Sequence, residues 1–499
     1  MTEEPQLVHT LRVGAANAVS ALCLFRSAVG ACGGSESLPA RESPHRRRAF
    51  AAVGTRHGRV LIYALDSFRQ ALVLECEAHP PNATTRTDPE NTDNAITCIT
   101  FKAPILFCQT RSYKILAFDL DACLALAPAP ATPLFSIPIN SLNFCKAHLM
   151  KLDSGYSSVK SDPVASLLEQ SRRTEGAWTH REPTRTARES LILPNTDSCL
   201  LLATTGITEE SDEVDIINLN TKRFCVKGLH LSKWITSSSQ ANADLAAKIF
   251  SGNGQDEILK VPVKTGMVMC LKMISAENDG HGGRRAMFRI LIGYESGDLA
   301  CWQVYAVESD EEAVSELMWF KKVYEQPILC LDVDTHGKYV VVGAAEESFT
   351  RITMDHWKNK SSSVALPTGS KGVSSIQIRA DGLAIALGCW DSMIRIYSGK
   401  SLTYLGVVGA DVHRRGVCCL TFVDEEHLLE NDSATSNSEP DVTESSQIVL
   451  VANRARGLIT KERVQGIAKS GYGMRQEVLP KNMLAVGTED GRVVFWRIY

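Results

Sequence analysis

The most constraining feature of this sequence is a hairpin pattern that recurs along its whole length. In each clear copy a β-rich run meets a glycine, two to four polar residues follow, and a second run alternates apolar residues. The clearest copies are AAVGTRHGRVLIYAL (51–65), RILIGYESGDLACWQV (289–304), AIALGCWDSMIRIYS (384–398) and MLAVGTEDGRVVFWRIY (483–499). A repeat of this kind predicts a fold built by stacking similar β units.

Weaker copies fill the intervals and bring the count to seven units. They lie at 96–120, at 140–150 continued at 199–220, and at 327–354, with further innermost-strand candidates at 18–25, 266–273, 372–379 and 416–423. One small twisted sheet with two apolar faces cannot bury them alone, so the units must stack, and a closed ring leaves none uncapped. The sequence therefore predicts an all-β fold, a seven-bladed WD40-type β-propeller that forms one domain over residues 1–499.

Closure of such a ring needs a latch between its two ends. The opening run LVHTL (7–11) has the pattern of an outer strand, and the sequence ends on VVFWRIY (493–499). We expect the N-terminal strand to complete the last blade, so that its loss would expose an unpaired strand edge.

Seven blades of about 42 residues each account for only about 300 of the 499 residues. The excess lies in polar, aromatic-poor tracts, which cannot bury enough apolar area to offset chain entropy and are predicted to be disordered loops outside the ring. The acidic and the basic tract of the last unit either pair with each other, dock partners or remain solvated, and solvated loops are favoured. The predicted insertions are 31–48, 79–94, 153–190, 232–260, 424–446 and 454–475.

Charge and hydropathy exclude several classes of protein. The net charge of -4 gives no reason to expect a polyanion partner, and the basic run 46–48 has no interleaved aromatics, so direct nucleic-acid binding is not expected. The N-terminus has acids in place of a basic signal region, and no stretch approaches the roughly 18 apolar residues of a membrane span. We expect a soluble protein of the nucleus, the cytoplasm or both, without membrane contact.

The 15 cysteines include no Cys-x-x-Cys pair. Most lie inside apolar strand-like runs, as Cys98, Cys270 and Cys330 do, so we expect reduced, buried packing residues. A zinc site or a disulfide framework would need clustered spacing.

Catalytic and cofactor motifs are missing from the sequence. It contains no phosphate-cradling glycine loop, no His-Glu-x-x-His and no Gly-x-Ser-x-Gly. His79, His230 and His413 each precede an innermost strand, where an imidazole can bond a turn aspartate within a blade. We therefore predict no catalytic, cofactor-binding or metal-binding residues, and no cofactor.

Other candidate residues have structural interpretations. Asp391 and Asp490 lie in hairpin turns, where an aspartate accepts backbone N–H bonds and fixes the turn. Trp302, Trp390 and Trp496 lie at blade ends, and packing between blades is favoured over a ligand cage.

Six ordered segments extend the pattern beyond a generic repeat: 211–220, 261–273, 291–304, 326–334, 372–397 and 484–499. The most specific pieces are Gly-Cys-Trp-Asp (388–391) with Ile-Arg-Ile (394–396), and Ser211, Asp212, Glu213 and Val214. Together these segments resemble the G-protein β-subunit-like protein 1 family, whose fungal members are called ASTRA-associated protein 1. The resemblance covers nearly the whole ring and skips the insertions.

The resemblance implies an adaptor. Members of that family are WD40 propellers linked to the ASTRA assembly and to the Tel2–Tti1–Tti2 co-chaperone, which with the Hsp90 system helps newly made phosphatidylinositol-3-kinase-related kinases to fold; chromatin-remodelling roles are also attached to it. The expected partners are therefore Tel2-like and Tti-like subunits and those kinases, with the motif 211–214 a candidate partner surface.

Two alternatives to this adaptor are weaker. A signalling β-subunit that binds G-protein α- and γ-chains would carry N-terminal coiled-coil heptads, and the strand pattern begins by residue 7 instead. A channel enzyme would place paired carboxylates or a histidine cluster at the starts of innermost strands, and none recurs there. The usual Gly-His and Trp-Asp signatures of WD40 repeats are also mostly replaced, as at 117–119 and 301–303.

Overall fold

The computed structural model describes the parts of the chain that form the ring and its short turns. These are residues 6–13, 18–27, 48–76, 95–112, 114–126, 131–139, 145–152, 199–205, 212–220, 223–231, 265–276, 285–306, 313–354, 360–367, 370, 372–409, 416–422 and 483–498. All six predicted insertions lie outside these ranges, except that Arg48 already begins a strand.

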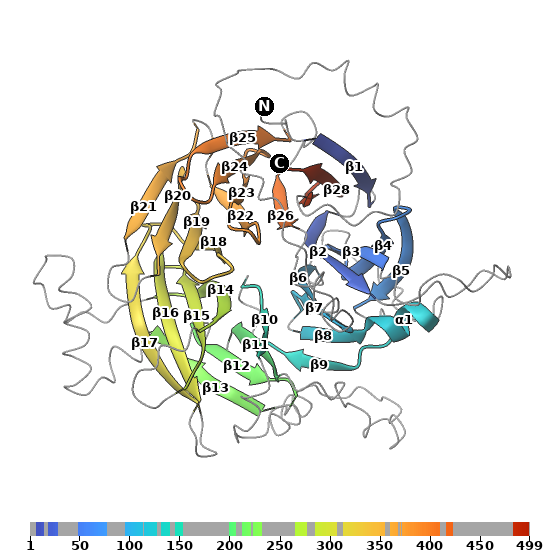
Figure 1. Ribbon diagram of the computed structural model, residues 1–499. Coiled ribbons are helices and arrows are strands. Elements are labelled where there is room, and N and C mark those ends of the chain that lie inside the picture. The colour runs from blue at the N-terminus through green and yellow to red at the C-terminus, as the bar shows by residue number, and fades with distance from the viewer. Residues whose placement is uncertain are drawn as a thin grey trace, which may run out of the picture.

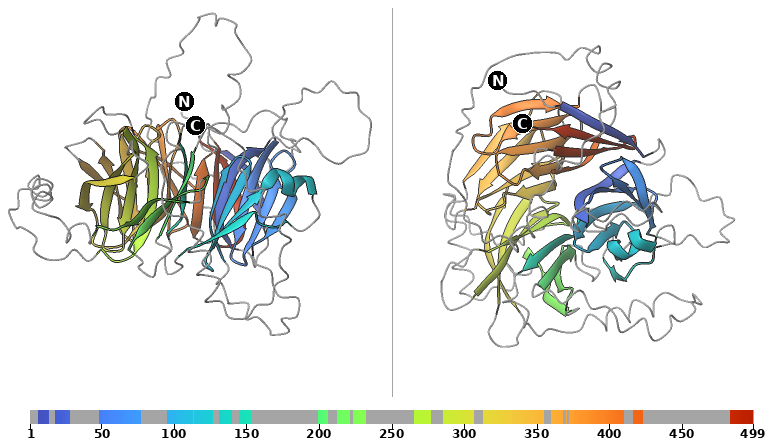
Figure 2. Two further views of the ribbon diagram at one scale, coloured as in Figure 1. Left: turned by 90° about the horizontal axis from the view of Figure 1, so that it is seen from below. Right: turned by 45° about the vertical axis from the view of Figure 1, so that its right-hand side comes forward.

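Seven four-stranded antiparallel sheets form a closed ring, as Figure 1 shows, so the predicted seven-bladed propeller is confirmed. Each sheet is one blade, and consecutive blades touch through their innermost strands around the whole circle. The edge view in Figure 2 shows the strands running from one face of the ring to the other.

The first three blades follow the order of the chain, with the innermost strand named first. Blade 1 contains β2 (Val19–Ser27), β3 (Arg48–Thr55), β4 (Arg59–Ala64) and β5 (Arg69–Glu75); blade 2 contains β6 (Ile96–Lys102), β7 (Ile105–Thr110), β8 (Lys114–Asp119) and β9 (Phe135–Pro138); blade 3 contains β10 (His148–Leu152), β11 (Cys199–Thr205), β12 (Val214–Asn218) and β13 (Arg223–Leu229).

The next three blades repeat the arrangement, and the seventh uses both chain ends. Blade 4 contains β14 (Val268–Ser275), β15 (Arg285–Tyr294), β16 (Asp298–Ala306) and β17 (Val314–Lys322); blade 5 contains β18 (Ile328–Val333), β19 (Tyr339–Ala344), β20 (Ser348–Thr353) and β21 (Ser361–Ala365); blade 6 contains β22 (Val373–Ile378), β23 (Ala384–Cys389), β24 (Ile394–Ser398) and β25 (Tyr404–Val408); blade 7 contains β26 (Val417–Phe422), β27 (Met483–Thr488), β28 (Arg492–Arg497) and β1 (Gln6–Arg12).

The predicted latch is present. β1 pairs antiparallel with β28, from Gln6 opposite Arg497 to Arg12 opposite Arg492, and Figure 1 shows the two strands side by side. Leu11 and Val13 enter the apolar cluster shared by blades 7 and 1. His9 also stacks on Phe68 of blade 1, with ring centroids 3.8 Å apart, so the latch touches both blades that it joins.

One helix was not predicted. α1 (Leu120–Leu126) lies between β8 and β9, and the Asp119 carboxylate caps it by accepting a hydrogen bond from the Ala122 N–H at 3.0 Å. Leu120 and Cys123 face the apolar cluster of blades 1 and 2. The helix is thus a short cover at the outer edge of blade 2, and the ring remains all-β. No helix among the described residues is long and apolar enough to cross a membrane.

A glycine recurs in the second strand of five blades, because neighbouring blades approach closely there. In blades 1, 4, 5, 6 and 7, a Cβ at this glycine would lie only 2.6–2.9 Å from the first, β-branched residue of the next blade's innermost strand. The glycines are Gly54, Gly293, Gly343, Gly388 and Gly487. A side chain at these positions would push the blades apart.

The topology also divides the insertions between the two faces of the ring. Because all innermost strands run in the same direction, the strand ends that bracket 31–48, 153–190 and 424–475 lie at one face, between the first and second strands of a blade. The strand ends that bracket 79–94 and 232–260 lie at the other face, where one blade leads into the next.

Candidate functional site: the turn rim

Six residues occupy one equivalent position at the face where blades lead into one another. Each follows the residue that pairs with the first residue of its blade's innermost strand, as Glu295 follows Tyr294 opposite Val268. We call these six the turn rim: Arg56, Arg111, Glu295, Ala345, Trp390 and Glu489. The corresponding position of blade 3 lies outside the described residues.

The backbone of the turn rim is held in the same way in several blades. The N–H groups of Arg111, Glu295, Trp390 and Glu489 donate to the carbonyl just before the innermost strand of the same blade, at 2.8–3.1 Å. The innermost strand carries a β-bulge at its start in six blades. A repeated frame therefore presents each side chain from the same place on its blade.

The side chains of the turn rim are of four different types: arginine, glutamate, alanine and tryptophan. All are exposed except Ala345, which is half-buried. Blades 1 and 2 supply Arg56 and Arg111, whereas blades 4 and 7 supply Glu295 and Glu489 and blade 6 supplies Trp390. An irregular set of exposed charged and aromatic groups on a regular frame is typical of a recognition surface.

Lys146 extends the basic side of this face to blade 3. The Gln109 side chain, which replaces the blade glycine in blade 2, holds the segment around it: Nε2 donates to the Cys145 carbonyl at 2.8 Å, and Oε1 accepts from the Ala147 N–H at 2.7 Å. Burial raises the pKa of Cys270, Cys330 and Cys419 on three further blades, and the Lys146 charge opposes that rise in each case. Lys146 lies two residues before β10 begins, at the face where blades lead into one another.

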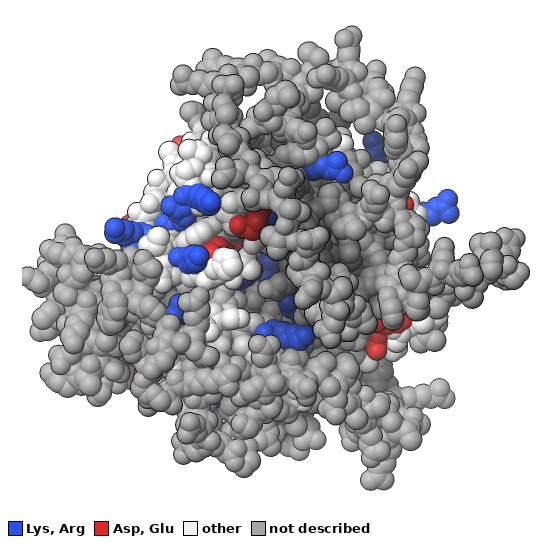
Figure 3. Space-filling model, in the orientation of Figure 1, with Lys and Arg blue, Asp and Glu red and all other residues white. Residues whose placement is uncertain are grey.

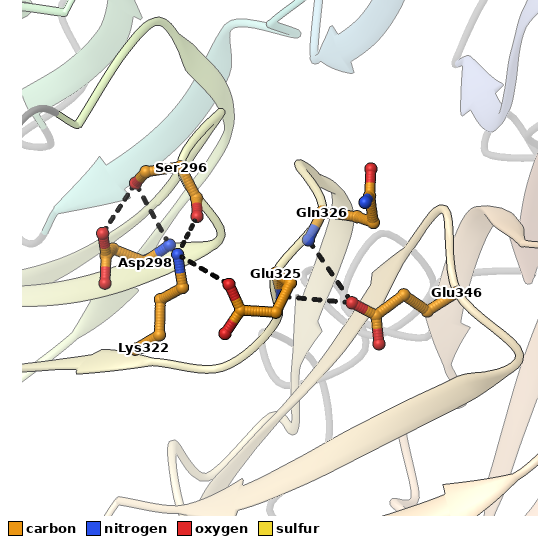
Figure 4. Close-up of polar contacts among 6 residues, drawn as sticks. All are labelled: Ser296, Asp298, Lys322, Glu325, Gln326 and Glu346. Carbon is orange, nitrogen blue, oxygen red and sulfur yellow. Dashed lines mark hydrogen bonds and ion pairs between the residues drawn. The ribbon is translucent and has the colours of Figure 1, made fainter.

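Acidic residues also lie at the junction of blades 4 and 5, drawn in Figure 4, beside the basic Lys322. Glu346 Oε1 accepts the N–H groups of Glu325 and Gln326 at 3.1 and 3.3 Å, which fixes the segment that enters β18. Lys322 donates to the Ser296 carbonyl at 2.6 Å and lies 3.8 Å from Glu325, which is largely exposed.

The turn below this junction is braced from inside. The Ser296 hydroxyl donates to Asp298 at 2.7 Å, and Gly297 accepts the N–H groups of Val323 and Tyr324 at 3.0 and 3.2 Å. Gly297 has φ +85°, and a Cβ there would lie 2.1 Å from the Tyr324 carbonyl oxygen, so this turn requires glycine.

Trp390 is half-exposed and does not pack between blades, contrary to the expectation from its blade-end position. A Cβ added at Gly372 would lie 3.0–3.1 Å from Cδ2, Cε2 and Cε3 of the indole. Since these atoms surround the fused bond of the ring system, the Gly372 backbone lies against a face of the indole. The indole projects from the blade, because β23 ends at Cys389 and the tight turn begins at Trp390.

The other two tryptophans lie where blades meet. Trp302 is 1% exposed in the apolar cluster shared by blades 3 and 4, and Trp496 belongs to the cluster shared by blades 6 and 7. Their indoles add large apolar areas to those blade contacts.

The two turn aspartates act in different ways. Asp391 accepts the Met393 N–H at 3.1 Å and forms a bidentate ion pair with the buried Arg395 guanidinium, at 2.9 and 2.5 Å. Asp490 instead accepts from the Thr488 hydroxyl and pairs with Arg492 at 3.0 Å. Asp391 thus fixes its turn through backbone and side chain, as predicted for a turn aspartate, while Asp490 contacts the side chains of Thr488 and Arg492.

Residues 212–214, the described part of the motif 211–214, make contacts inside blade 3. Asp212 pairs with the buried His230 at 2.5 Å, which is the imidazole–aspartate contact expected for that histidine. Glu213 lies under Gly228, and Val214 begins β12 with no exposed area. The described part of this motif is therefore structural, because Asp212 and His230 join the turn to the end of β13. Ser211, His79 and His413 lie outside the described residues.

Side chains of the innermost strands form contacts from one blade to the next. Asp332 of β18 pairs with Lys272 of β14 at 3.0 Å, and accepts the Ile378 N–H of β22 at 2.7 Å. His148 Nδ1 of β10 accepts the Met273 N–H of β14 at 3.3 Å, and burial, with Lys272 and Lys102 adding to it, holds its pKa well below the usual value. These polar groups are satisfied within the ring and tie blades 3 to 6 together.

The thiols behave as packing groups. The 14 described cysteines are free, and burial raises the pKa of most of them, for example to about 12 for Cys199 and Cys301. Such thiols are protonated at neutral pH and poor nucleophiles. Within the described ranges, no group of three or more His, Cys, Asp and Glu is arranged to hold a metal ion. On the face drawn in Figure 3, the described basic and acidic side chains lie near one another, without a broad area of one sign.

Comparison with known proteins gives the same family that the motifs indicated. The chain is 24% identical over 368 residues to ASTRA-associated protein 1 of Aspergillus flavus, covering 73% of this chain and 70% of that protein. It is 22% identical over 412 residues to ASTRA-associated protein 1 of Aspergillus niger, covering 77% and 76%. The chain is therefore similar to the ASTRA-associated protein 1 family of WD40 proteins.

A mouse protein extends the same relationship. Guanine nucleotide-binding protein subunit beta-like protein 1 of Mus musculus is 25% identical over 186 residues, which is 34% of this chain and 52% of that relative. The β-propeller domain of Myceliophteria thermophila Cps50 (Swd1) aligns over 99% of this chain and 100% of that domain, with a TM-score of 0.48 and 11% identity. No family model matches the chain.

The turn rim of this ASTRA-associated protein 1 relative was not predicted as a set. Each member stands two residues after the glycine of a hairpin copy, or after Gln109 in blade 2, so the repeat itself carried the signal. Aligning the copies by their glycines would have shown Arg, Arg, Glu, Ala, Trp and Glu at one position. What it would not have shown is that Lys146 joins them from another element.

Proposed function

We propose that this chain is a non-catalytic scaffold of the ASTRA and Tel2–Tti1–Tti2 co-chaperone pathway, which supports newly made phosphatidylinositol-3-kinase-related kinases. The similarity to ASTRA-associated protein 1 over about three quarters of the chain motivates the pathway. A link to chromatin remodelling, and residence in the nucleus, the cytoplasm or both, belong to the same proposal.

The observation that carries the scaffold role is the turn rim. A frame that repeats its bulge, its glycine and its backbone hydrogen bonds presents side chains that differ from blade to blade. If the ring served only to be stable, small or uniform residues at these positions would suffice. Exposed Arg56, Glu295 and Trp390 instead supply the charge and aromatic area that protein interfaces use.

The chemistry of the described residues supports a binding role over catalysis. His230 is paired with Asp212, and the His148 pKa is held well below its usual value, which leaves a neutral ring whose Nδ1 accepts a backbone bond. Thiols such as Cys145 and Cys270 have raised pKa values because they are buried. Each of these groups is committed to packing or to cross-blade bonding.

The proposal is tested by depleting the protein in its own cells and measuring the steady-state amounts of the large kinases. We expect the kinase amounts to fall and to return when the intact chain is re-expressed, because kinases that fail to fold without assistance are degraded. Affinity purification with mass spectrometry should recover Tel2-like and Tti-like subunits. Normal kinase amounts after complete depletion would contradict the pathway assignment.

A matched variant separates the ring from its insertions in the same experiment. Re-expression of a chain in which 424–475 is replaced by a short turn tests whether the acidic and basic tracts recruit partners, because Phe422 and Leu484 already pair across the first two strands of blade 7. Rescue by this variant would assign recruitment to the ring.

A G-protein β-like signalling adaptor is the second candidate, favoured by the name of the mouse relative. A pull-down with a γ-chain peptide distinguishes the two, since only the signalling adaptor should retain it.

A further inference from the structure

Among the described tryptophans, Trp390 alone is exposed, with 50% of its area accessible. Exposed tryptophan is enriched at protein interfaces, where its large, rigid ring supplies contact area. Gly372 lies against one face of this indole, because a Cβ added at Gly372 would lie 3.0–3.1 Å from its Cδ2, Cε2 and Cε3 atoms. The exposed area therefore belongs largely to the opposite face and the edges.

The turn that carries Trp390 is rigid. Cys389 N–H donates to the Met393 carbonyl at 3.0 Å, and Ser392 N–H donates back to the Cys389 carbonyl at 3.1 Å. Ser392 has φ +68°, a left-handed conformation that the Asp391–Arg395 ion pair helps to hold. A ring fixed in this way loses little conformational entropy when a ligand stacks on it.

Carboxylates lie on the blades to either side of Trp390. Blade 7 contributes Glu489, blade 5 contributes Glu346, and blade 4 contributes Glu295. Within the described part of the chain, none of these three forms an ion pair with a Lys or Arg, and Glu346 and Glu295 accept backbone N–H groups. Blades 4 to 7 therefore present an acidic arc with an aromatic face inside it.

The remaining blades carry the opposite charge. Arg56, Arg111 and Lys146 come from blades 1, 2 and 3 and are exposed. The charges of Arg56 and Lys146 oppose, and that of Glu489 reinforces, the rise that burial causes in the pKa of Cys418. Basic groups of blades 1 to 3 and acidic groups of blades 4, 5 and 7 therefore lie at one face of the ring.

We propose that this face binds an extended protein segment with a basic and an acidic residue. An arginine or lysine of the segment stacks on the exposed face of Trp390 inside the acidic arc, and an acidic residue a few positions away reaches Arg56, Arg111 or Lys146. Cations favour the face of an indole, and flanking carboxylates strengthen the attraction. The inference rests on the proposed scaffold function and names the chemistry of its partner.

Charge complementarity selects this occupant over others. A nucleic acid would be repelled by Glu295, Glu346 and Glu489, and an acidic membrane surface would be repelled in the same way. A purely basic segment would meet repulsion from Arg56 and Lys146. Only a segment with both signs in a fixed order matches the two arcs.

The test needs no known partner. A display library of random twelve-residue peptides is selected against the full chain and, in parallel, against the Trp390→Ala variant. We expect peptides enriched by the intact chain to share an arginine or lysine with an acidic residue at a fixed spacing. That motif should be absent from the peptides enriched by Trp390→Ala.

Binding of the selected peptide is then measured by fluorescence polarisation. We expect Trp390→Ala to weaken it about fivefold or more, and Glu489→Lys about tenfold or more. Arg56→Glu should weaken it through the other arc. A peptide whose basic residue is changed to glutamine should lose little further affinity when Trp390 is changed to alanine, because the two groups no longer interact in that complex.

Leu405→Ser is the matched control. Leu405 is 54% exposed on β25, the outermost strand of the same blade, so its loss alters exposed apolar area away from the turn rim. Unchanged peptide binding in this variant is expected. Loss of binding in Leu405→Ser but not in Trp390→Ala would overturn the proposal, and so would enriched peptides that lack a basic residue.

The outcomes also separate this inference from the proposed function. A Trp390→Ala chain that restores the large kinases but does not bind the peptide would leave the scaffold role intact and assign the turn rim to another partner. Normal kinase amounts after depletion, together with specific peptide binding, would keep the site and remove only the pathway. Far-ultraviolet circular dichroism of each variant checks that the ring is folded.

Discussion

At the scale of single residues, the glycine that recurs in the second strand of five blades leaves room for the neighbouring blade. Gly487 shows why: a Cβ there would lie 2.5 Å from the Cys419 sulfur and 2.6 Å from Cγ1 of Val19. Val19 belongs to blade 1 and Gly487 to blade 7, so this glycine lies at the contact that closes the ring. Blade 2 shows the exception, since Gln109 fills the equivalent position by bonding Cys145 and Ala147.

Replacement of this glycine should destabilise the protein. We expect Gly487→Ala to lower the free energy of unfolding by about 1–3 kcal/mol, because the added methyl group overpacks the contact between blades 7 and 1. Urea denaturation measures the change. Gly406→Ala is the control, since a Cβ at Gly406 meets no atom within 4 Å, and it should change stability by less than about 0.5 kcal/mol. Equal losses in the two variants would show that packing is not the cause.

At the scale of elements, the innermost strands are tied to one another by polar side chains as well as by apolar contact. His148 of β10 accepts a backbone N–H of β14, and Lys272 of β14 pairs with Asp332 of β18. These bonds cross from blade to blade, where no backbone ladder exists. Each innermost strand is therefore positioned by its neighbours and not only by its own sheet.

The His148 contact predicts a dependence of stability on pH. Its pKa is depressed in the folded state by burial and by the Lys272 and Lys102 charges, so the unfolded chain binds the proton more readily. Stability should accordingly fall as the pH drops from about 7 to about 5, through the unfolded value near 6.5. His148→Asn, which keeps an acceptor but does not titrate, should reduce this slope in thermal unfolding measured across that range. An unchanged slope would assign it to other groups.

Elements also differ in how well the sequence predicted them. The strands of blade 3 were recognised although residues 153–198 separate β10 from β11, because each half kept its β pattern. The helix α1 was missed because seven residues between two strands give too few turns for a helical period to stand out. Its cap at Asp119 is a local signal, but an aspartate after a strand equally favours a turn.

At the scale of the whole molecule, the ring depends on a strand from the opposite end of the chain. β1 supplies the outermost strand of blade 7 and contributes Leu11 and Val13 to the cluster shared with blade 1. Without it, β28 would present an unpaired edge, and the His9–Phe68 stacking across the two blades would be lost.

Removal of this latch should therefore weaken the entire ring. Deleting residues 1–13 is expected to lower the free energy of unfolding by roughly 3–5 kcal/mol, given the apolar side chains and the ladder that are lost, and to promote self-association through the β28 edge. Calorimetry and light scattering measure the two effects. Deleting only residues 1–5, which precede β1, should leave both unchanged; a similar effect of the two deletions would locate the stabilisation outside the strand.

The sequence by itself determined the ring. Seven hairpin copies fixed the number of blades, and a strand pattern at each end of the chain fixed the latch, because both are written in short-range alternation that any one blade must satisfy. The same local signals identified His230 as a partner for a turn aspartate and Asp391 as the residue that fixes its turn.

Only the tertiary structure decided what lies together on the ring. Trp390, which was expected to pack between blades, is half-exposed, while Asp212, Glu213 and Val214 make contacts inside blade 3. The turn rim and Lys146 come from separate blades and meet only because the ring closes. Repeats specify each blade from local sequence, whereas a surface built from one residue per blade has no local signature, so its chemistry became visible only once the blades were arranged in a circle.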